Sequence, residues 1–411
     1  MENTTTAATK KYSLKNWLQS LGPGLITAAL VFGPSKMTIT SKLGAEYGFA
    51  LLWIIVIAIF FMIIFTSMAA RIGMATNQSL LSSIREKFGT PVAIAVGVGV
   101  FLVCTSFQAG NSIGVGIAIG EITGTPPKQW IIIFTMVGIG LLFFRTFYKV
   151  LEKIMILLIA VMLVSFITTF VLVKPQLSGI ISGLSPSVPQ GSLGLVIAFT
   201  ASCVSIVGAF YQSYLVQERR RIRKDISQVK NDSFTGIFIL GIMSAIVLIC
   251  AATVLQPKGI KVNSATDMSK ALEPLFGKYA SALFLTGLFG AAFSSLIGNA
   301  SVGGTLLGDA LGYGSQLNSK KVKYLIASVM IIGAIIAIVF GKLPLELIVF
   351  AQSVTIFIVP FIGIAMYLIA NDEKLMGKMK NTITIKLFAG LGLLVIIALA
   401  LVNIKDLFFK N

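Results

Sequence analysis

The stretch Phe32–Gly33–Pro34–Ser35–Lys36–Met37–Thr38 interrupts an apolar run that is otherwise long enough to cross a membrane. Proline lacks a donor N–H and its ring clashes with the preceding turn, so Gly33-Pro34 is expected to break the helix. A lysine at mid-membrane depth costs about 2.5–3.5 kcal/mol even on insertion scales. Membranes tolerate an open backbone and a buried charge only where they line a cavity inside the protein. The stretch therefore predicts a binding site of the kind that secondary transporters build from broken helices.

The composition around this stretch is that of a polytopic membrane protein. Hydrophobic residues make up 56% of the 411 residues, charged residues only 12%, and the mean hydropathy is +0.93. Soluble domains of this length do not have such values. The sequence contains no histidine, which excludes His-ligated metal sites and His-based catalytic triads. The three cysteines lie in apolar runs without CxxC spacing and are interpreted as small hydrophobic residues.

Apolar runs of about 18–28 residues predict an all-α protein with eleven transmembrane helices. The predicted spans are 21–46, 48–74, 91–120, 130–147, 150–173, 192–217, 233–255, 279–305, 323–340, 343–370 and 386–403. With the N-terminus in the cytoplasm, most Lys and Arg residues fall in inner loops, as the positive-inside rule requires. The net charge of +18 is therefore attributed to topology and not to a nucleic-acid surface. We expect one multi-pass transporter domain, 1–411, in the plasma membrane.

A second polar interruption lies five spans later, in the run 202–213, which includes Gly208. Small residues in membrane helices often serve only close packing. Two interrupted helices at matching places instead predict an inverted repeat with the site where the repeats meet. The first repeat is assigned to residues 14–174, the second to 192–370, and 386–403 is an extra helix.

Several motifs in the sequence resemble those of the NRAMP (natural resistance-associated macrophage protein) divalent-metal transporters. They are Gly22–Pro23–Gly24, the run from Gly44 to Trp53, the run from Ala69 to Thr76, and Ala351–Gln352 with Pro360–Phe361. The resemblance extends from about Leu14 to Ile369. It implies the LeuT-like fold of that family, with two inverted repeats of five helices (5+5) plus one extra helix.

The residues that bind metal in the family are replaced in this sequence. Where the family has Asp-Pro-Gly-Asn in its first span, this chain has Gly33, Pro34, Ser35 and Lys36. Where the family has Met-Pro-His in its sixth span, a gap-free alignment places Gln212, Ser213 and Tyr214. The acidic residues of the family's proton path align with Gln108 and Asn111. We therefore expect no metal-ligating residues.

A divalent cation usually needs at least one carboxylate in a dry site, and Lys36 would repel it. The helix N-terminus created at Pro34 instead offers free N–H groups and a partial positive charge. The sequence therefore predicts transport of a small anion, bicarbonate or a small carboxylate, by alternating access. The predicted substrate-binding residues are Gly33, Ser35, Lys36, Thr38, Asn111, Gly208, Tyr211, Gln212, Ser213 and Gln352.

Lys36 leaves three interpretations open. It binds the anion, it acts as a fixed charge that replaces a bound cation, or it carries a coupled proton together with the path at Gln108 and Asn111. The alternative substrate is a divalent metal cation, Mg²⁺ or Mn²⁺, as in the family. A receptor that no longer transports is a weaker alternative.

Other function classes fit less well. An enzyme would need converging acid, base or metal groups in the membrane, and the sequence offers no such set, so no catalytic residues are expected. A channel is disfavoured because paired broken helices are typical of alternating access. We expect an ion as the substrate, the lipid bilayer as the surroundings, no cofactor, no nucleic-acid partner and a monomer.

Overall fold

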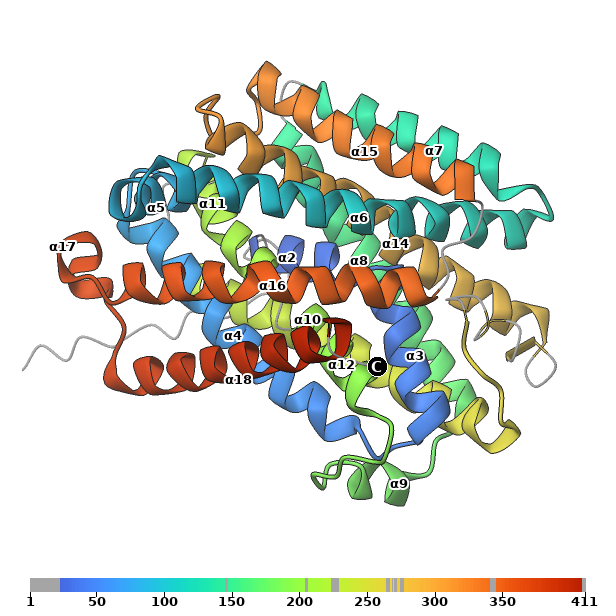
Figure 1. The fold of residues 1–411 in the computed structure, drawn as a ribbon. Coiled ribbons are helices and arrows are strands. Elements are labelled where there is room, and N and C mark those ends of the chain that lie inside the picture. Colours follow the sequence, from blue (N-terminus) through green and yellow to red (C-terminus); the bar gives the residue numbers. More distant parts are fainter. Residues whose placement is uncertain are drawn as a thin grey trace, which may run out of the picture.

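The computed structural model describes residues 23–144, 147–203, 206–222, 229–263, 267, 269, 272–273, 277–340 and 345–408. Every regular element in these ranges is a helix (Figure 1). The elements before residue 174 are α2 (Pro23–Val31), α3 (Pro34–Tyr47), α4 (Leu52–Ala75), α5 (Leu80–Phe88), α6 (Thr90–Thr123), α7 (Pro127–Leu142) and α8 (Phe147–Val173). After α9 (Leu177–Ser182) the chain continues as α10 (Leu193–Cys203), α11 (Ile206–Ile222), α12 (Val229–Val254) and η1 (Gln256–Lys258). The remaining elements are α14 (Lys278–Ala310), α15 (Lys320–Phe340), α16 (Leu345–Ala370), α17 (Glu373–Met376), η2 (Gly377–Met379) and α18 (Ile383–Phe408).

The predicted break in the first span is present between α2 and α3. Gly33 is extended, with φ −96° and ψ 178°, and it precedes Pro34, the first residue of α3. A proline in this position costs no hydrogen bond, because the first N–H groups of a helix have no partner within the helix. The Met37 N–H then donates to the Gly33 carbonyl at 3.0 Å, which starts the new helix. The sequence therefore fixes both the end of α2 and the start of α3.

The second interruption predicted from the sequence, 202–213, overlaps the end of α10 and the first turns of α11. Residues 204–205 of the predicted polar run lie outside the described residues, and α11 begins at Ile206. Gly208 and Ser213, which belong to the same run, are therefore helical. Within the predicted run, residues 202–203 and 206–213 are helical in the described part of the chain.

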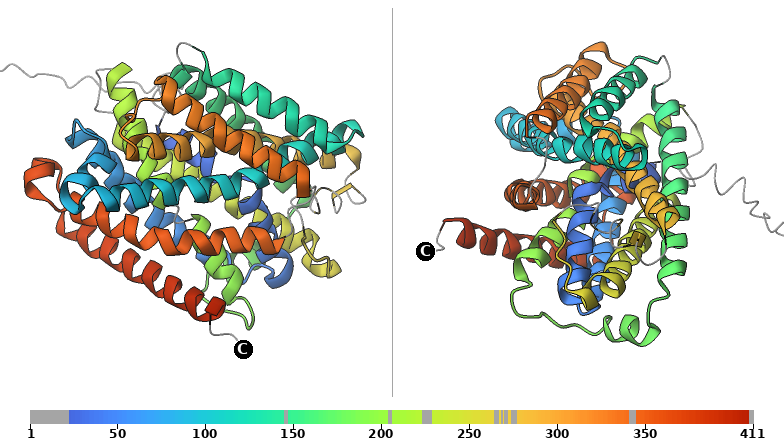
Figure 2. Two further views of the ribbon diagram at one scale, coloured as in Figure 1. Left: turned by 45° about the horizontal axis from the view of Figure 1, so that its top comes forward. Right: turned by 90° about the vertical axis from the view of Figure 1, so that its right-hand side faces the viewer.

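The long helix α14 forms the centre of the bundle. It packs against α6, α8, α15 and α2, and 78% of its most apolar stretch is buried. At the other extreme, α18 lies at the edge of the bundle in both views of Figure 2, with only 28% of its corresponding stretch buried. A membrane helix that is buried on all sides belongs to the core, whereas an exposed apolar one faces lipid.

Seven of the described helices are long and apolar enough to cross a membrane. They begin at Leu52, Thr90, Phe147, Phe234, Lys278, Lys320 and Ile383. The halves of the broken helices are each too short to be counted, and Pro127–Leu142 and Ile358–Ala370 are shorter apolar helices. The chain is thus a multi-pass membrane protein, and the number eleven stays a prediction, as do the repeat boundaries.

Basic loops that the sequence assigned to the cytoplasm meet at one end of the molecule. Figure 1 shows α5 and α17 together at this end. The Lys87 ammonium donates to the Asp372 carboxylate at 2.6 Å, and Arg85 donates to the carbonyls of Asp309 and Ala310 at 2.9 Å. By the positive-inside rule this is the cytoplasmic end.

Close packing of α3 against α12 depends on Gly44. A Cβ at this position would lie 2.3 Å from the Leu248 carbonyl oxygen, which is backbone and cannot move aside. We predict that Gly44→Ala lowers the free energy of unfolding by about 1–3 kcal/mol, as other overpacking substitutions do. Thermal unfolding of the detergent-solubilised protein measures the change. The control is Gly140→Ala in α7, where a Cβ meets nothing within 4 Å; an equal loss of stability in both variants would contradict this interpretation.

The contact between α5 and α17 should depend on pH. The hydrogen bond from Lys87 holds the pKa of the Asp372 carboxyl below its usual range. A lowered folded-state pKa stabilises the fold above the unfolded pKa, and this contribution is lost as the pH falls through the folded value. We predict that residues 373–381 lose protection against hydrogen exchange below about pH 4, and that Asp372→Asn and Lys87→Met flatten this dependence. An unchanged pH profile in both variants would show that the pair does not hold α17.

Candidate functional site

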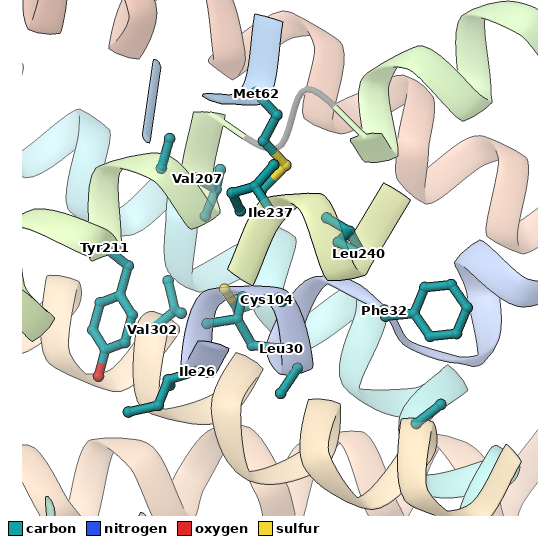
Figure 3. Packing of buried hydrophobic residues seen from close by; sticks show 14 of the residues in the cluster. Ile26, Leu30, Phe32, Met62, Cys104, Val207, Tyr211, Ile237, Leu240 and Val302 are labelled. Carbon is teal, nitrogen blue, oxygen red and sulfur yellow. The ribbon is translucent and has the colours of Figure 1, made fainter. Parts of the chain in front are cut away.

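A cavity of about 70 Å³ lies where α2 ends and α3 begins. Figure 3 shows Leu30, Cys104, Val207 and Val302 near this break, and all four line the cavity. Such a volume holds several water molecules, because one water needs about 10–15 Å³ on this measure. The residues that line it come from α2, α3, α6, α11, α14 and α16, and the polar or small ones are Gly33, Ser35, Lys36, Asn111, Gly208, Asn299 and Thr355.

The first turn of α3 brings a buried charge to the cavity. Lys36 is 2% exposed, and among the described residues neither its Nζ nor the Ser35 Oγ has a hydrogen-bond partner. The ammonium lies 5.6 Å from the centre of the Phe199 ring. This distance is within the range of a cation–π interaction, which offsets part of the cost of the buried charge.

A network of three amides forms the wall contributed by α6 and α14. Gln108 is fully buried and donates to the Leu296 carbonyl at 2.9 Å. Its Oε1 accepts from Asn299 at 3.3 Å and from Asn111 at 3.4 Å. Asn299 also donates to the Cys104 carbonyl at 2.6 Å. The network holds Asn111 and Asn299 at the cavity in fixed orientations.

Two serines of α14 hold the last turn of α2. Ser294 donates to the Ala29 carbonyl at 3.0 Å, and Ser295 donates to the carbonyls of Ala29 and Leu30 at 3.2 and 3.1 Å. These carbonyls have lost their helical partners at the break, so the serines satisfy them. A Cβ on Gly33 would come within 2.8 Å of the Ser295 Oγ and 3.0 Å of the Asn111 Oδ1. A larger residue at position 33 would therefore require the Ser295 and Asn111 side chains to shift.

Five of the residues that the sequence predicted for the site line the cavity: Gly33, Ser35, Lys36, Asn111 and Gly208. Gln108 lies behind them in the amide network. The role of these residues in binding or coupling stays a prediction.

Four predicted residues are not among the cavity lining. Thr38 donates to the Pro34 carbonyl at 2.9 Å and Ser213 to the Phe210 carbonyl at 2.7 Å, so both hydroxyls bond their own helix. Gln212 accepts a hydrogen bond from Thr27 of α2. Tyr211 is fully buried beside the cavity. The side chain of Gln352 lies outside what the structure describes.

Sequence reasoning missed Asn299, Thr355 and Cys104, all of which line the cavity. A signal existed for Asn299, because an amide inside the apolar run 279–305 is costly unless it is hydrogen-bonded. Thr355 gave a weaker signal, since threonine commonly bonds its own helix backbone.

Polar contacts join α11, α14 and α5 on the cytoplasmic side of the cavity. Tyr214 donates to the Asp309 carboxylate at 2.6 Å, and the Leu81 N–H donates to the Tyr214 hydroxyl at 3.3 Å. The Tyr214 ring stacks on Tyr211, with centroids 6.1 Å apart. Arg85 holds the end of α14 from the other side. These contacts hold the three helices together at this end.

Comparisons with known proteins agree with this architecture. A family model described as natural resistance-associated macrophage protein-like matches residues 24–406. The divalent metal cation transporter MntH of Bacillus subtilis is 26% identical over 400 residues, which cover 95% of this chain and 93% of the relative. A mutant of the manganese transporter of Eremococcus coleocola superposes with a TM-score of 0.75 at 20% identity, covering 99% of this chain and 91% of that one. A nucleobase-cation-symport family transporter superposes with a TM-score of 0.58 at 14% identity, covering 94% and 91%.

The fold, with its broken helix at a central cavity, defines the chain as a helical membrane protein of the LeuT-like fold. The chain belongs to the NRAMP family, because the family model matches nearly its whole length. Both the resemblance and the fold class expected from the sequence are confirmed.

The predicted anion substrate is wrong. The relatives over almost the whole chain are named divalent metal cation transporters, and the structural neighbour is a manganese transporter. The prediction rested on the charge of Lys36, on the helix N-terminus at Pro34 and on the absence of carboxylates near the predicted site. The structure shows another way in which the buried charge of Lys36 is stabilised, since its ammonium lies over the Phe199 ring.

Asn299 should be essential to the wall of the cavity. Asn299→Leu removes the donor to the Cys104 carbonyl and to Gln108 Oε1, so buried acceptors lose a partner. We predict a loss of about 1–3 kcal/mol in the free energy of unfolding, measured by thermal unfolding in detergent. The control is Ser106→Leu on the exposed face of α6, where the hydroxyl bonds only the Leu102 carbonyl. Equal stability of the Asn299 variant and the wild type would rule out a structural role for the network.

Proposed function

We propose that this chain carries a divalent metal cation across the membrane by alternating access. The observation that carries the proposal is the match of the family model to residues 24–406, because the relatives along this length are named as divalent metal cation transporters. The cavity at the break between α2 and α3 supports it, since secondary transporters bind their substrates at such breaks.

The ligands offered by the cavity favour a hydrated ion. The lining residues that the structure describes include no carboxylate, and no group of three His, Cys, Asp or Glu side chains lies together among the described residues. The side-chain oxygens in the described lining belong to Ser35, Asn111, Asn299 and Thr355, and Leu30 and Val31 at the carbonyl end of α2 line the cavity with them. Neutral oxygens suit a hard cation that keeps part of its water, as Mg²⁺ does. Mg²⁺ is therefore favoured over Mn²⁺, and binding should be weak.

The carbonyl end of α2 helps to attract the cation. The C-terminus of a helix carries a partial negative charge, and Leu30 and Val31 at this end line the cavity. In other transporters with discontinuous helices, such ends coordinate cations.

Lys36 opposes the bound metal in this proposal. A charge of +1 near a charge of +2 raises the energy by several kcal/mol at an effective dielectric constant of about 20. The Lys36 ammonium lies 5.6 Å from the centre of the Phe199 ring, an attraction that offsets part of the cost of its buried charge. Lys36 thus sets the affinity for the metal at a low level.

The test is uptake of Mg²⁺ and Mn²⁺ into proteoliposomes, followed with metal-sensitive dyes. We predict saturable entry with the wild type and at least a tenfold lower KM with Lys36→Met, because the repulsion is removed. The matched control is Lys42→Met, which removes one charge from the same helix at a site where the ammonium already pairs with Glu46 at 3.4 Å. Its KM should stay near that of the wild type. Absence of metal entry with both the wild type and Lys36→Met would overturn the proposal.

A further inference from the structure

A second cavity, of about 300 Å³, lies at the cytoplasmic end of α4. Its walls are the last turns of α4, the segment 378–382 and the start of α18. The lining includes three cationic residues, Arg71, Lys378 and Lys380. It is separate from the substrate cavity, with which it shares no lining residue.

Arg71 is fixed at this cavity by neutral acceptors. It is 8% exposed, and its guanidinium donates to the Ser67 carbonyl at 3.4 Å, the Met379 carbonyl at 3.4 Å and the Asn381 Oδ1 at 2.6 Å. A guanidinium has five N–H donors, so two remain beyond these three bonds. No ion pair of Arg71 is found among the described residues. A buried cation without a neighbouring anion is costly. The two remaining N–H donors of Arg71 could bind such an anion.

The two lysines add charge that is only partly compensated. Lys380 pairs with Glu373 at 3.0 Å, but the Glu373 side chain is 77% exposed and its charge is screened by water. Lys378 is exposed and has no ion pair among the described residues. The cavity therefore has an excess of positive charge.

The surroundings of the cavity are those of a membrane interface. Ile383 and Leu387 on the first turns of α18 are 77% and 70% exposed, and α18 is at the edge of the bundle (Figure 2). Ile385 of the same helix lines the cavity. An acyl chain lying along α18 would cover these apolar side chains, which a free phosphate ion would leave exposed.

We infer that this cavity binds the phosphate headgroup of an anionic lipid of the cytoplasmic leaflet. Arginine donors in a fixed fork match phosphate oxygens, and basic pockets between helices on this side of a membrane suit anionic headgroups. The lipid would bridge α4 and α18 and hold the outermost helix to the bundle. This inference does not depend on which substrate the chain carries.

The test uses the full-length protein purified in detergent and native mass spectrometry with added lipid. The probes are dioleoyl phosphatidylglycerol, dioleoyl phosphatidylcholine and inorganic phosphate. We expect the wild type to retain phosphatidylglycerol in preference to phosphatidylcholine. The double variant Lys378→Gln with Lys380→Gln should bind it about thirtyfold more weakly, because each basic residue at the surface contributes about fivefold.

The matched control is Lys149→Gln with Lys153→Gln, which removes two exposed charges from the cytoplasmic end of α8. It should bind phosphatidylglycerol as the wild type does. Arg71→Lys keeps the charge but loses the fork, and it should also weaken binding. The proposal would be overturned if the double variant of Lys378 and Lys380 bound phosphatidylglycerol as tightly as the wild type does. A loss of affinity of the same size in the control variant would also overturn it. Competition by inorganic phosphate at equal concentration would show that the ligand is free phosphate and not a lipid.

Discussion

The structure depends on one constraint: a backbone without helical hydrogen bonds must find partners where no water is available. Proline at position 34 ends α2 and starts α3, and the carbonyls freed by the break would be costly in lipid. Ser294 and Ser295 of α14 supply the donors, from more than 260 residues further along the chain. This requirement explains why α14 lies at the centre of the bundle and why Gly33 must be small.

The same break sets the electrostatics of the substrate cavity. One helix ends and another begins there, so a partial negative and a partial positive charge face the same small volume. Amides and hydroxyls surround it, while Lys36 is the cationic residue among its described lining. This chain thus shares its scaffold with relatives named as divalent metal cation transporters, while the oxygens in its described cavity lining are neutral. In the proposed function, the scaffold determines where the ion binds, and the side chains determine how strongly.

Charged groups away from the substrate cavity organise the cytoplasmic end. Tyr214 and Asp309 join α11 to α14, Lys87 and Asp372 join α5 to α17, and Arg71 joins α4 to the segment before α18. Each contact links segments about 95–310 residues apart. The cytoplasmic end carries the basic residues that the positive-inside rule describes. Polar contacts therefore hold the helices together at that same end.

The sequence alone determined the membrane class, the break at Gly33–Pro34 and the family, because hydropathy and the missing N–H of proline act locally. It also placed Gly33, Ser35, Lys36, Asn111 and Gly208 at the cavity that the structure contains. Tertiary structure decided which remaining polar groups reach it. Thr38 and Ser213 turn back to their own helices, whereas Asn299 reaches the cavity from a helix that no local pattern pairs with α6. The predicted anion was inferred from Lys36, the helix N-terminus at Pro34 and the absence of carboxylates, and that inference could not take account of Phe199, which only the folded chain brings to Lys36.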